Sequence, residues 1–387
     1  MRESRDVDLD HHIRHSALPR PGGQRELGEL ISRLHANQLD LRRPLWEVHL
    51  IEGLEGNRFA IYHKVHHSLV DGMSAMRLIT RALSPDPTRR GMEWFWTVGA
   101  GPSADSHELT REHRGTVDSV VEAAEGILAN LAGVGRLAVN YGKSRLAGGP
   151  LQAPYRPGRS PLGGRIGRHR RFATQCYPLA DLKACARASE SSLNEIVLYL
   201  TGTALRRYLA EHAIVPSGPL TAGIPVSLRR PGDQTIGTEL TFIVADLGTN
   251  VADPLQRLEI IKNSSSEAKG QLQRLPARAR WSQTITVNGL YMAGLIAGLG
   301  QRSPVPFSLP VSNVPGPPET LYCNGSRLDA VFPISLLTHG NALNVTCISY
   351  ADTINFGLTG ARDSVPHLQR MAVYMGDALA ELREVVL

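Results

Sequence analysis

The sequence predicts an α/β fold made of two halves with a groove between them. Strand-like alternation and helical periodicity occur together in the first 90 residues and again after residue 160. A segment rich in proline and glycine separates these regions and contains one helical stretch, VDSVVEAAEGILANLAGVGRLAVNYG. We therefore expect an amino-terminal half at 1–90, a crossover at 91–160 and a carboxy-terminal half at 161–387.

The composition is that of a folded protein. The chain has 387 residues, 42% hydrophobic and 20% charged, which is enough to bury a large core. The net charge of +6 and the isoelectric point near 9.3 are modest, and the densest basic run, 165–171, is short. We expect no nucleic-acid partner, because this balance better suits an anionic small molecule or an anionic lipid surface.

Neither secretion nor a membrane span is predicted. The four cysteines are scattered and form no Cys-x-x-Cys unit, so a reducing cytoplasm is the simplest setting. The amino terminus, MRESRDVDLDHH, has no apolar stretch of the kind found in signal peptides. The most apolar run, 287–300, is shorter than a bilayer span and favours a buried or interfacial helix.

In the amino-terminal half, the hydrophobic pattern predicts a helix, two strands and a second helix. The first three elements correspond to QRELGELISRLHANQ (24–38), PLWEVHLIEG (44–53) and FAIYHKVHH (59–67). Strand alternation places His67 at the end of the second strand and His66 on its opposite face. Helical spacing resumes at Met73, so KVHHSLVDGMSAM (64–76) is a strand-loop-helix junction, where loops often carry function.

The carboxy-terminal half begins with a predicted helix at 191–212. Ser192 and Glu195 at its start fit a capping box, in which each residue caps the backbone of the other. Four strand segments follow: LTAGIPVSL (220–228), ELTFIVADL (239–247), PFSLPVSNV (306–314) and the hairpin LNVTCISYADTINFGLTG (343–360).

The junction has the residues that acyl transfer to an alcohol requires. Such a reaction needs a base for the hydroxyl proton, and an imidazole with a pKa of about 6.5 suits this task near neutral pH. We expect His67 to face a cleft while His66 is fixed in the scaffold. Asp71 lies across a tight loop from His67, and Gly72 lets the backbone turn where a side chain would obstruct it.

Other interpretations of these residues must be weighed. A lone histidine is most often structural, but the joint spacing His-His-x-x-x-Asp-Gly at a strand-loop-helix junction favours a chemical role. Adjacent strand histidines face apart, so we expect no metal site. A serine hydrolase is not supported, because Ser74 follows Gly72 but Met76 stands where the nucleophile elbow needs a second glycine. The other pair, His11-His12, has no Asp-Gly at the right distance, so we expect it on the surface or in a loop.

Several motifs together resemble a known family. HHSLVDG resembles the HHxxxDG motif of the coenzyme A-dependent acyltransferases, a motif shared with peptide-synthetase condensation domains. The segments DLDHHIRHSALPRPG, RPLWEVHLIEGL, GIPVSLR and VSNVPGP narrow the resemblance to the bacterial wax ester synthase/acyl-CoA:diacylglycerol acyltransferases. This resemblance implies two chloramphenicol-acetyltransferase-like halves, with mixed sheets, flanking helices and an active-site channel between them.

The resemblance also implies an activity. A long-chain acyl group would pass from acyl-CoA, a co-substrate and not a bound cofactor, to diacylglycerol or a long-chain alcohol. His67 would be the general base, His66 would support the site, and Asp71 would hold the loop by pairing with an arginine. Substrate would be contacted by the following residues: Gly72, Trp46, Asn194, Ser312, Asn313 and Gly316.

The chain departs from the family pattern at three points. The family's Asn-Asp pair reads Asn194-Glu195, a Gly-Asn pair reads Gly237-Thr238, and relatives carry a further segment ahead of DLDHHIRHSALP. The alternative hypothesis is therefore a non-catalytic or degenerate lipid-binding paralogue. The greasy substrates and the mild positive charge predict a cytoplasmic protein held peripherally on the inner face of the membrane or on lipid droplets.

Overall fold

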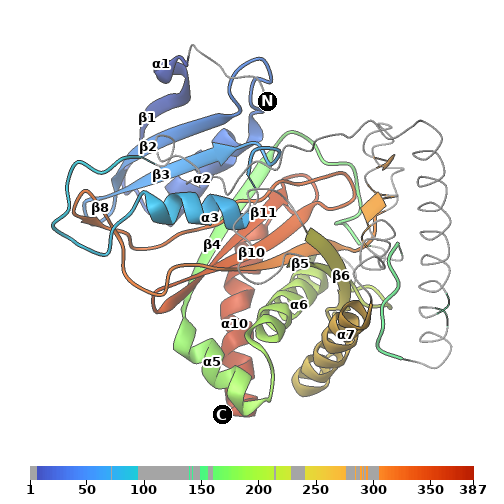
Figure 1. Cartoon of the computed structure of the whole chain (residues 1–387). Coiled ribbons are helices and arrows are strands. Elements are labelled where there is room, and N and C mark those ends of the chain that lie inside the picture. Colours follow the sequence, from blue (N-terminus) through green and yellow to red (C-terminus); the bar gives the residue numbers. More distant parts are fainter. Residues whose placement is uncertain are drawn as a thin grey trace, which may run out of the picture.

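The computed structural model describes residues 7–70, 72–94, 149–155, 160–212, 215–227, 240–275 and 305–387, with a few isolated positions between 139 and 294. Within these residues, a three-stranded sheet has the order β1-β2-β3, and a six-stranded sheet has the order β4-β11-β10-β7-β5-β6. Figure 1 shows the small sheet at one end of the large sheet, with helices on the far side. The predicted α/β class is confirmed.

The small sheet and its helices come from the amino-terminal part of the chain. The elements are α1 (Leu9–His12), β1 (Ile13–Ala17), α2 (Gln24–Ala36), β2 (Trp46–Leu54), β3 (Arg58–Val65) and α3 (Gly72–Arg81). Strand β1 pairs with β2 in parallel, and β2 pairs with β3 antiparallel. The predicted helix and strands are confirmed, and α1 and β1 are additional.

Strand β3 ends two residues earlier than its alternation predicted. Trp46 pairs with Val65, and these two residues begin β2 and end β3. The residues before Trp46 are Leu45 and Pro44, and proline has no N–H to continue the ladder. His66 and His67 therefore lie in the turn after β3, not at the end of the strand.

The six-stranded sheet comes from the carboxy-terminal part of the chain. Its strands are β4 (Arg170–Pro178), β5 (Thr221–Ser227), β6 (Leu240–Asp246), β7 (Leu309–Pro315), β10 (Leu343–Tyr350) and β11 (Thr353–Ala361). The helices are α5 (Leu179–Ala188), α6 (Leu193–His212), α7 (Pro254–Arg274) and α10 (Leu368–Val386), and a short ribbon is formed by β8 (Tyr322–Cys323) and β9 (Ser326–Arg327). The predicted strands are confirmed as β5, β6, β7, β10 and β11, and the predicted helix as α6. The predicted helical stretch at 117–142 and the apolar run at 287–300 lie largely outside the described residues.

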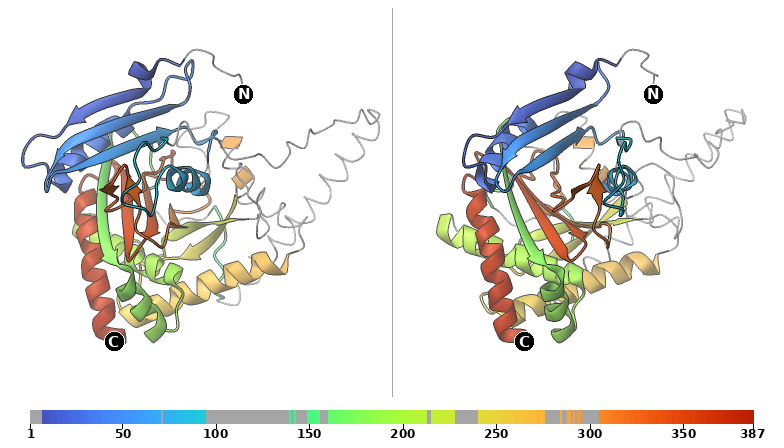
Figure 2. Two further views of the ribbon diagram at one scale, coloured as in Figure 1. Left: turned by 60° about the vertical axis from the view of Figure 1, so that its left-hand side comes forward. Right: turned by 90° about the vertical axis from the view of Figure 1, so that its left-hand side faces the viewer.

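The two faces of strand β10 pack against different parts of the molecule. Val345 and Cys347 point into the main core, which α5, α6, α7 and α10 cover. Ile348 points to the opposite face, where it packs with Met76 of α3. Both views of Figure 2 show the small sheet (blue) at one end of the molecule and α7 (yellow) near the other. The helix α3 and the helical layer thus lie on opposite faces of the large sheet.

Helix α2 joins the two sheets. The Ser32 hydroxyl accepts a hydrogen bond of 2.9 Å from the backbone N–H of Phe172 on β4. Phe172 is buried with Ile31 of α2 and Ile51 of β2 in a second apolar cluster. The two halves are therefore packed together and not merely tethered.

Candidate active site

His66 and His67 emerge from β3 into a tight turn beside the strand β2. The His66 N–H donates to the carbonyl of Leu45 at 2.9 Å, and the carbonyl of His66 accepts from the Leu69 N–H at 2.9 Å. The Nδ1 atom of His66 accepts from the backbone N–H of Ser68 at 3.2 Å and lies 2.7 Å from the Ser68 hydroxyl. A backbone N–H can only donate, so Nδ1 is unprotonated and neutral His66 carries its proton on Nε2.

His67 differs from its neighbour in its contacts. Its side chain is exposed, and among the described residues no group hydrogen-bonds to its ring. Both ring nitrogens are therefore available to a substrate, whereas one nitrogen of His66 is occupied by the turn. Asp71, the third predicted catalytic residue, lies outside the described residues.

Helix α3 brings this turn to the large sheet. Met73 and Met76, on its inward face, pack against Val314 of β7 and Ile348 of β10. Ser74 is also buried, with 3% of its surface exposed, so it is placed as a packing residue of α3 and not as a presented nucleophile. Gly72 begins α3, and a Cβ there would meet no heavy atom of the described residues within 4 Å, so the obstruction to a side chain predicted for this position is not seen in that part of the chain.

Ser312, Asn313 and Gly316 lie on or just after β7, in the same sheet region. The segment is mainly strand, as its alternation predicted. Ser312 pairs with Thr346 and shares its face with Val314, the face that α3 covers. Asn313 shares the other face with Val311, and its Oδ1 accepts from the Cys347 thiol at 3.5 Å. The structure brings Ser312 to the side of α3 and turns the Asn313 side chain away.

Asn194 and Glu195 lie on the helical side of the large sheet. The predicted capping box is confirmed, because the Ser192 N–H donates to Glu195 at 2.7 Å and the Glu195 N–H donates to Ser192 Oγ at 3.3 Å. The Ser265 hydroxyl of α7 also donates to Glu195, at 2.8 Å. Burial alone would raise the pKa of this carboxyl, but the hydrogen bonds from Ser192 and Ser265 outweigh burial and lower it. Asn194 stands beside Glu195 at the start of α6, and its Nδ2 is buried with no hydrogen-bond partner among the described residues.

Two histidines that sequence reasoning passed over lie half-buried on α2 and β3, the elements next to the histidine turn. His63 of β3 and His35 of α2 both have pKa values lowered to about 4, in each case mainly because burial disfavours the charged ring. His35 contacts the Tyr62 hydroxyl at 3.1 Å and the Ser335 carbonyl at 3.2 Å. The partners of His35 are distant in sequence, so they leave no local signal.

The sequence predicted the pair His11-His12 on the surface or in a loop, and the structure contradicts this prediction. Both residues belong to the one-turn helix α1, and only 1% of the surface of His12 is exposed. The His12 ring stacks on the indole of Trp46, with ring centroids 4.4 Å apart. The burial has a physical cause, because the indole offers His12 an apolar face and the Trp46 carbonyl offers it an acceptor.

The described residues contain neither a metal-ligand cluster nor a membrane-spanning helix. In that part of the chain, no group of three or more histidine, cysteine, aspartate or glutamate side chains could hold a metal ion. Among the helices there, none is both long and apolar enough to cross a bilayer.

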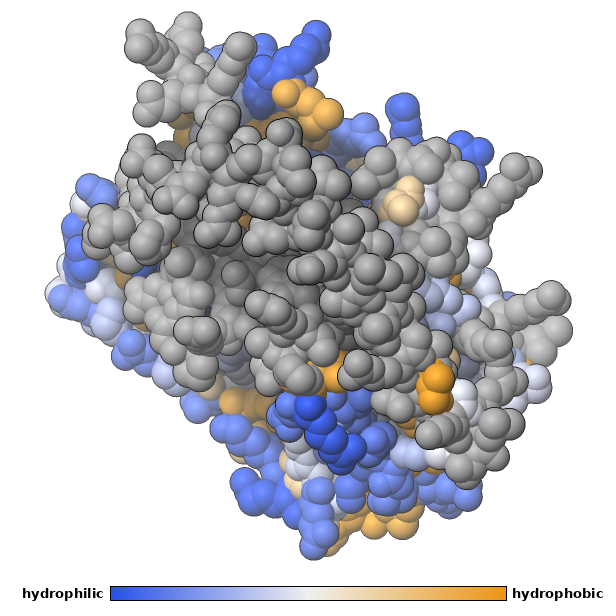
Figure 3. Space-filling view, turned by 45° about the vertical axis from the view of Figure 1, so that its right-hand side comes forward, coloured by the Kyte–Doolittle hydropathy of each residue, from blue (hydrophilic) through white to orange (hydrophobic). Residues whose placement is uncertain are grey.

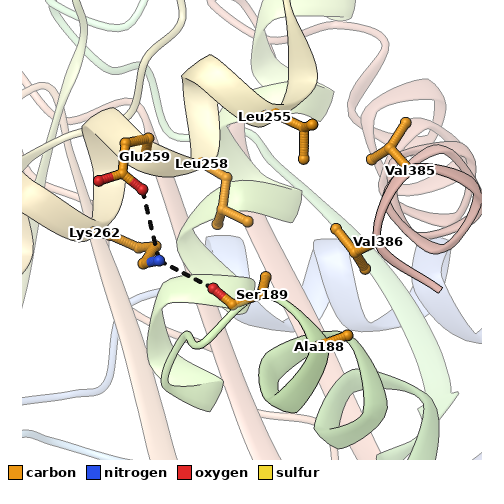
Figure 4. Close-up of a pocket in the computed structure, with 8 residues that line it drawn as sticks. All are labelled: Ala188, Ser189, Leu255, Leu258, Glu259, Lys262, Val385 and Val386. Carbon is orange, nitrogen blue, oxygen red and sulfur yellow. Dashed lines mark hydrogen bonds and ion pairs between the residues drawn. The ribbon is translucent and has the colours of Figure 1, made fainter.

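A small surface pocket of about 300 Å³ lies away from the histidine turn, where α5, α7 and α10 meet. Lys262 at its edge donates to the Ser189 carbonyl at 3.0 Å and pairs with Glu259 at 3.5 Å (Figure 4). Figure 3 shows apolar surface at the lower end of that view. Leu255 and Val385, which line the pocket, are both exposed. The charged groups of the pocket are thus paired with each other.

Comparisons with known proteins agree with this geometry. Residues 1–197 match the family described as "Wax ester synthase/diacylglycerol acyltransferase catalytic domain", and residues 236–383 match the "WS/DGAT C-terminal domain". A putative diacylglycerol O-acyltransferase of Mycobacterium tuberculosis is 41% identical over 417 residues, which cover 97% of this chain and 82% of that relative. The O-acyltransferase WSD of Acinetobacter baylyi is 36% identical over 388 residues, which cover 99% of this chain and 83% of that relative.

Solved structures give the same result. The wax ester synthase/diacylglycerol acyltransferase from Marinobacter aquaeolei superposes with a TM-score of 0.76 at 35% identity, covering 99% of this chain and 82% of that one. The first condensation domain of the calcium-dependent antibiotic synthetase superposes with a TM-score of 0.53 at 18% identity over 97% of this chain and 75% of its own, which shows a shared fold only. The resemblance predicted from the motifs is confirmed, and the chain belongs to the wax ester synthase/diacylglycerol acyltransferase family.

Proposed function

We propose that His67 is the general base of an acyl transfer from acyl-CoA to the hydroxyl of diacylglycerol or a long-chain alcohol. As a member of its family, the chain is an acyltransferase of triacylglycerol or wax ester synthesis. The observation that supports His67 is its exposed ring, unengaged by the described residues, in the turn that α3 holds against β7 and β10. His66, by contrast, already uses Nδ1 within that turn.

A single imidazole can carry the proton through both steps of the reaction. Neutral His67 takes the hydroxyl proton as the alcohol oxygen attacks the thioester carbonyl, so an oxyanion and an imidazolium form together. Collapse of the oxyanion breaks the carbon–sulfur bond, and the imidazolium returns the proton to the coenzyme A thiolate. Ser312, on the face of β7 that α3 covers, is the side chain we propose as a donor to the oxyanion.

The other predicted site residues would have supporting roles in this reaction. Trp46 begins β2 beside the last residue of β3, so its indole would flank the acyl chain next to the turn. Gly72 and Gly316 would allow substrate to approach the backbone, and Asp71 would brace the loop. Asn194 and Asn313 would act from behind the sheet by supporting its packing, since Asn313 contacts Cys347.

The organisation and the location of the protein are proposed on other grounds. We place the amino-terminal acyltransferase half at 1–90, the crossover at 91–160 and the carboxy-terminal half at 161–387, with the channel between the halves.

Peripheral binding of a cytoplasmic protein to a membrane or lipid droplet is supported by water-insoluble substrates and by the net charge of +6. Flotation with vesicles containing diacylglycerol and anionic lipid tests this, and protein left entirely in the dense fractions at low salt would contradict it.

The test of the chemistry compares the two adjacent histidines. Purified His67→Ala and His66→Ala are checked for folding by thermal denaturation and assayed for release of coenzyme A from a long-chain acyl-CoA, with diacylglycerol or hexadecanol as acceptor. We expect His67→Ala to lose roughly 10²–10⁴-fold in kcat, the usual contribution of a general base, and His66→Ala to lose less. A folded His67→Ala with wild-type turnover would refute the proposal, and a wild-type chain that binds lipid without turnover would favour the non-catalytic alternative.

A further inference from the structure

His12 makes two specific contacts with one residue. Its Nδ1 lies 2.7 Å from the carbonyl oxygen of Trp46, and because a carbonyl only accepts, Nδ1 carries the hydrogen. The imidazole and the indole are also stacked, at an interplanar angle of 23°. His12 therefore holds both the backbone and the side chain of Trp46.

A second link ties α1 to the same segment. Asp8 caps α1 by accepting the His11 N–H at 3.2 Å, and it pairs with Arg43 at 3.3 Å. Arg43 stands directly before Pro44, which opens the Pro-Leu-Trp motif. Helix α1 is thus linked to Trp46 of the motif and to Arg43, the residue before it, although the Asp8–Arg43 pair is exposed and contributes little by itself.

The Pro-Leu-Trp segment in turn holds the histidine turn. Trp46 pairs with Val65, the last residue of β3, and the Leu45 carbonyl accepts the N–H of His66 at 2.9 Å. The path from His12 to His67 therefore passes through a stacked ring, one strand pair and one backbone hydrogen bond. Each of these steps is a direct contact, and the last one reaches His66, to which His67 is covalently bonded.

We infer that His12 is a positioning residue for the proposed base His67, acting through Trp46. Hydrogen bonding to the Trp46 carbonyl keeps the Leu45–Trp46 backbone in place, and the Leu45 carbonyl then sets where His66 and His67 leave the strand. The stack fixes the indole on the side from which an acyl chain would approach. The inference rests on the proposed function of His67.

Histidine suits this position better than a purely apolar residue. A phenylalanine could stack on Trp46 but would remove the hydrogen bond from His12 to the Trp46 carbonyl in a nearly dry site, since His12 is 1% exposed. An asparagine could donate but could not stack. His11 provides the matched control, because its backbone N–H and carbonyl bond to Asp8 and Arg14, while its ring only touches the edge of His12.

The experiment uses four variants of the full chain: His12→Phe, His12→Asn, His11→Phe and His67→Ala. For each folded protein, kcat and the two KM values, for acyl-CoA and for the alcohol, are measured with thermal denaturation alongside. We expect His12→Phe to lose about 10- to 100-fold in kcat, because small misplacements of a catalytic group cost this much, with less than about threefold change in the KM for acyl-CoA. His12→Asn should recover part of kcat, and His11→Phe should match the wild type.

A double variant separates this inference from the proposed function. If His12 acts through His67, adding His12→Phe to His67→Ala should lower the remaining rate by less than about twofold. Independent, multiplicative losses would overturn the inference, as would wild-type kcat in folded His12→Phe. Full activity in His67→Ala would instead refute the general base, whatever the His12 variants show.

Discussion

The Nε2 atom of His35 lies 3.2 Å from the carbonyl oxygen of Ser335, a residue 300 positions away. The carbonyl can only accept, so Nε2 carries the hydrogen, and Nδ1 accepts from the Tyr62 hydroxyl at 3.1 Å. Ser335 continues the chain of contacts, because its hydroxyl lies 3.0 Å from that of Thr346 on β10. A neutral histidine on α2 therefore joins β3, which leads to the histidine turn, to the sheet that α3 covers.

This arrangement predicts that stability rises with pH between about 4 and 6.5. Burial lowers the pKa of His35 to about 4, and burial does the same for His63, whereas both rings regain about 6.5 on unfolding. In this window the unfolded chain binds more protons, so acid favours unfolding and the stabilisation is complete above pH 6.5. The difference corresponds to roughly 3 kcal/mol for each group. Urea unfolding at pH 4.5, 5.5 and 7 measures it.

The control replaces one titrating ring at a time. His35→Gln keeps hydrogen-bonding atoms but cannot titrate, so it should remove the part of the pH dependence that is due to His35 and leave the part that is due to His63. An identical slope in His35→Gln would show that His35 is not responsible.

Glu195 is predicted to stabilise the fold without taking part in the chemistry. Glu195→Ala removes the capping box at the start of α6 and the hydrogen bond from the Ser265 hydroxyl, which keeps only the Lys262 carbonyl at 3.2 Å as an acceptor. We expect a loss of about 2–3 kcal/mol in the free energy of unfolding, the sum of a helix cap and a buried hydrogen bond. Calorimetry measures the loss, and kcat per folded molecule should stay near the wild type. A large fall in kcat with unchanged stability would give this carboxylate a catalytic role.

Two glycines of the proposed substrate site should respond differently to alanine. At Gly316 a Cβ would lie 2.3 Å from the Ser349 carbonyl oxygen, so Gly316→Ala must separate β7 from β10 and should cost about 1–3 kcal/mol. At Gly72 the space is open and the residue begins a helix, so Gly72→Ala should be neutral or slightly stabilising. Melting temperatures separate the two variants.

Steady-state kinetics then test whether the substrate approaches the backbone of Gly72. If substrate approaches it, Gly72→Ala should raise KM although the protein is fully stable. Unchanged kinetics would remove Gly72 from the site.

Ser312 is predicted to affect the catalytic rate, and Asn313 is predicted to affect stability. Ser312 shares the face that α3 covers, whereas Asn313 contacts the buried Cys347 on the other face. Ser312→Ala should therefore lower kcat at nearly unchanged stability, and Asn313→Ala should lower the melting temperature at nearly unchanged kcat per folded molecule. Coenzyme A release and calorimetry on the same preparations measure both. The reverse pattern would mean that the end of β7 is twisted away from regular alternation.

Local pattern predicted much of the fold. Alternation identified most strands of both sheets, because each strand has one face in a core. The capping residues Ser192 and Glu195 marked the start of α6. Helix α7 was missed although its signal was present, since Asp253 caps it and Pro254 follows in the first turn.

The sequence by itself determined the fold class, most of the strands and the motif that carries His67, because these depend on residues near one another in the chain. Only the tertiary structure decided where β3 ends, since that depends on Trp46 and Pro44 in the neighbouring strand. Tertiary structure also placed His12 under Trp46 and His35 against Ser335. A periodic pattern shows that a side chain is buried, but its partner is set by how separate elements pack.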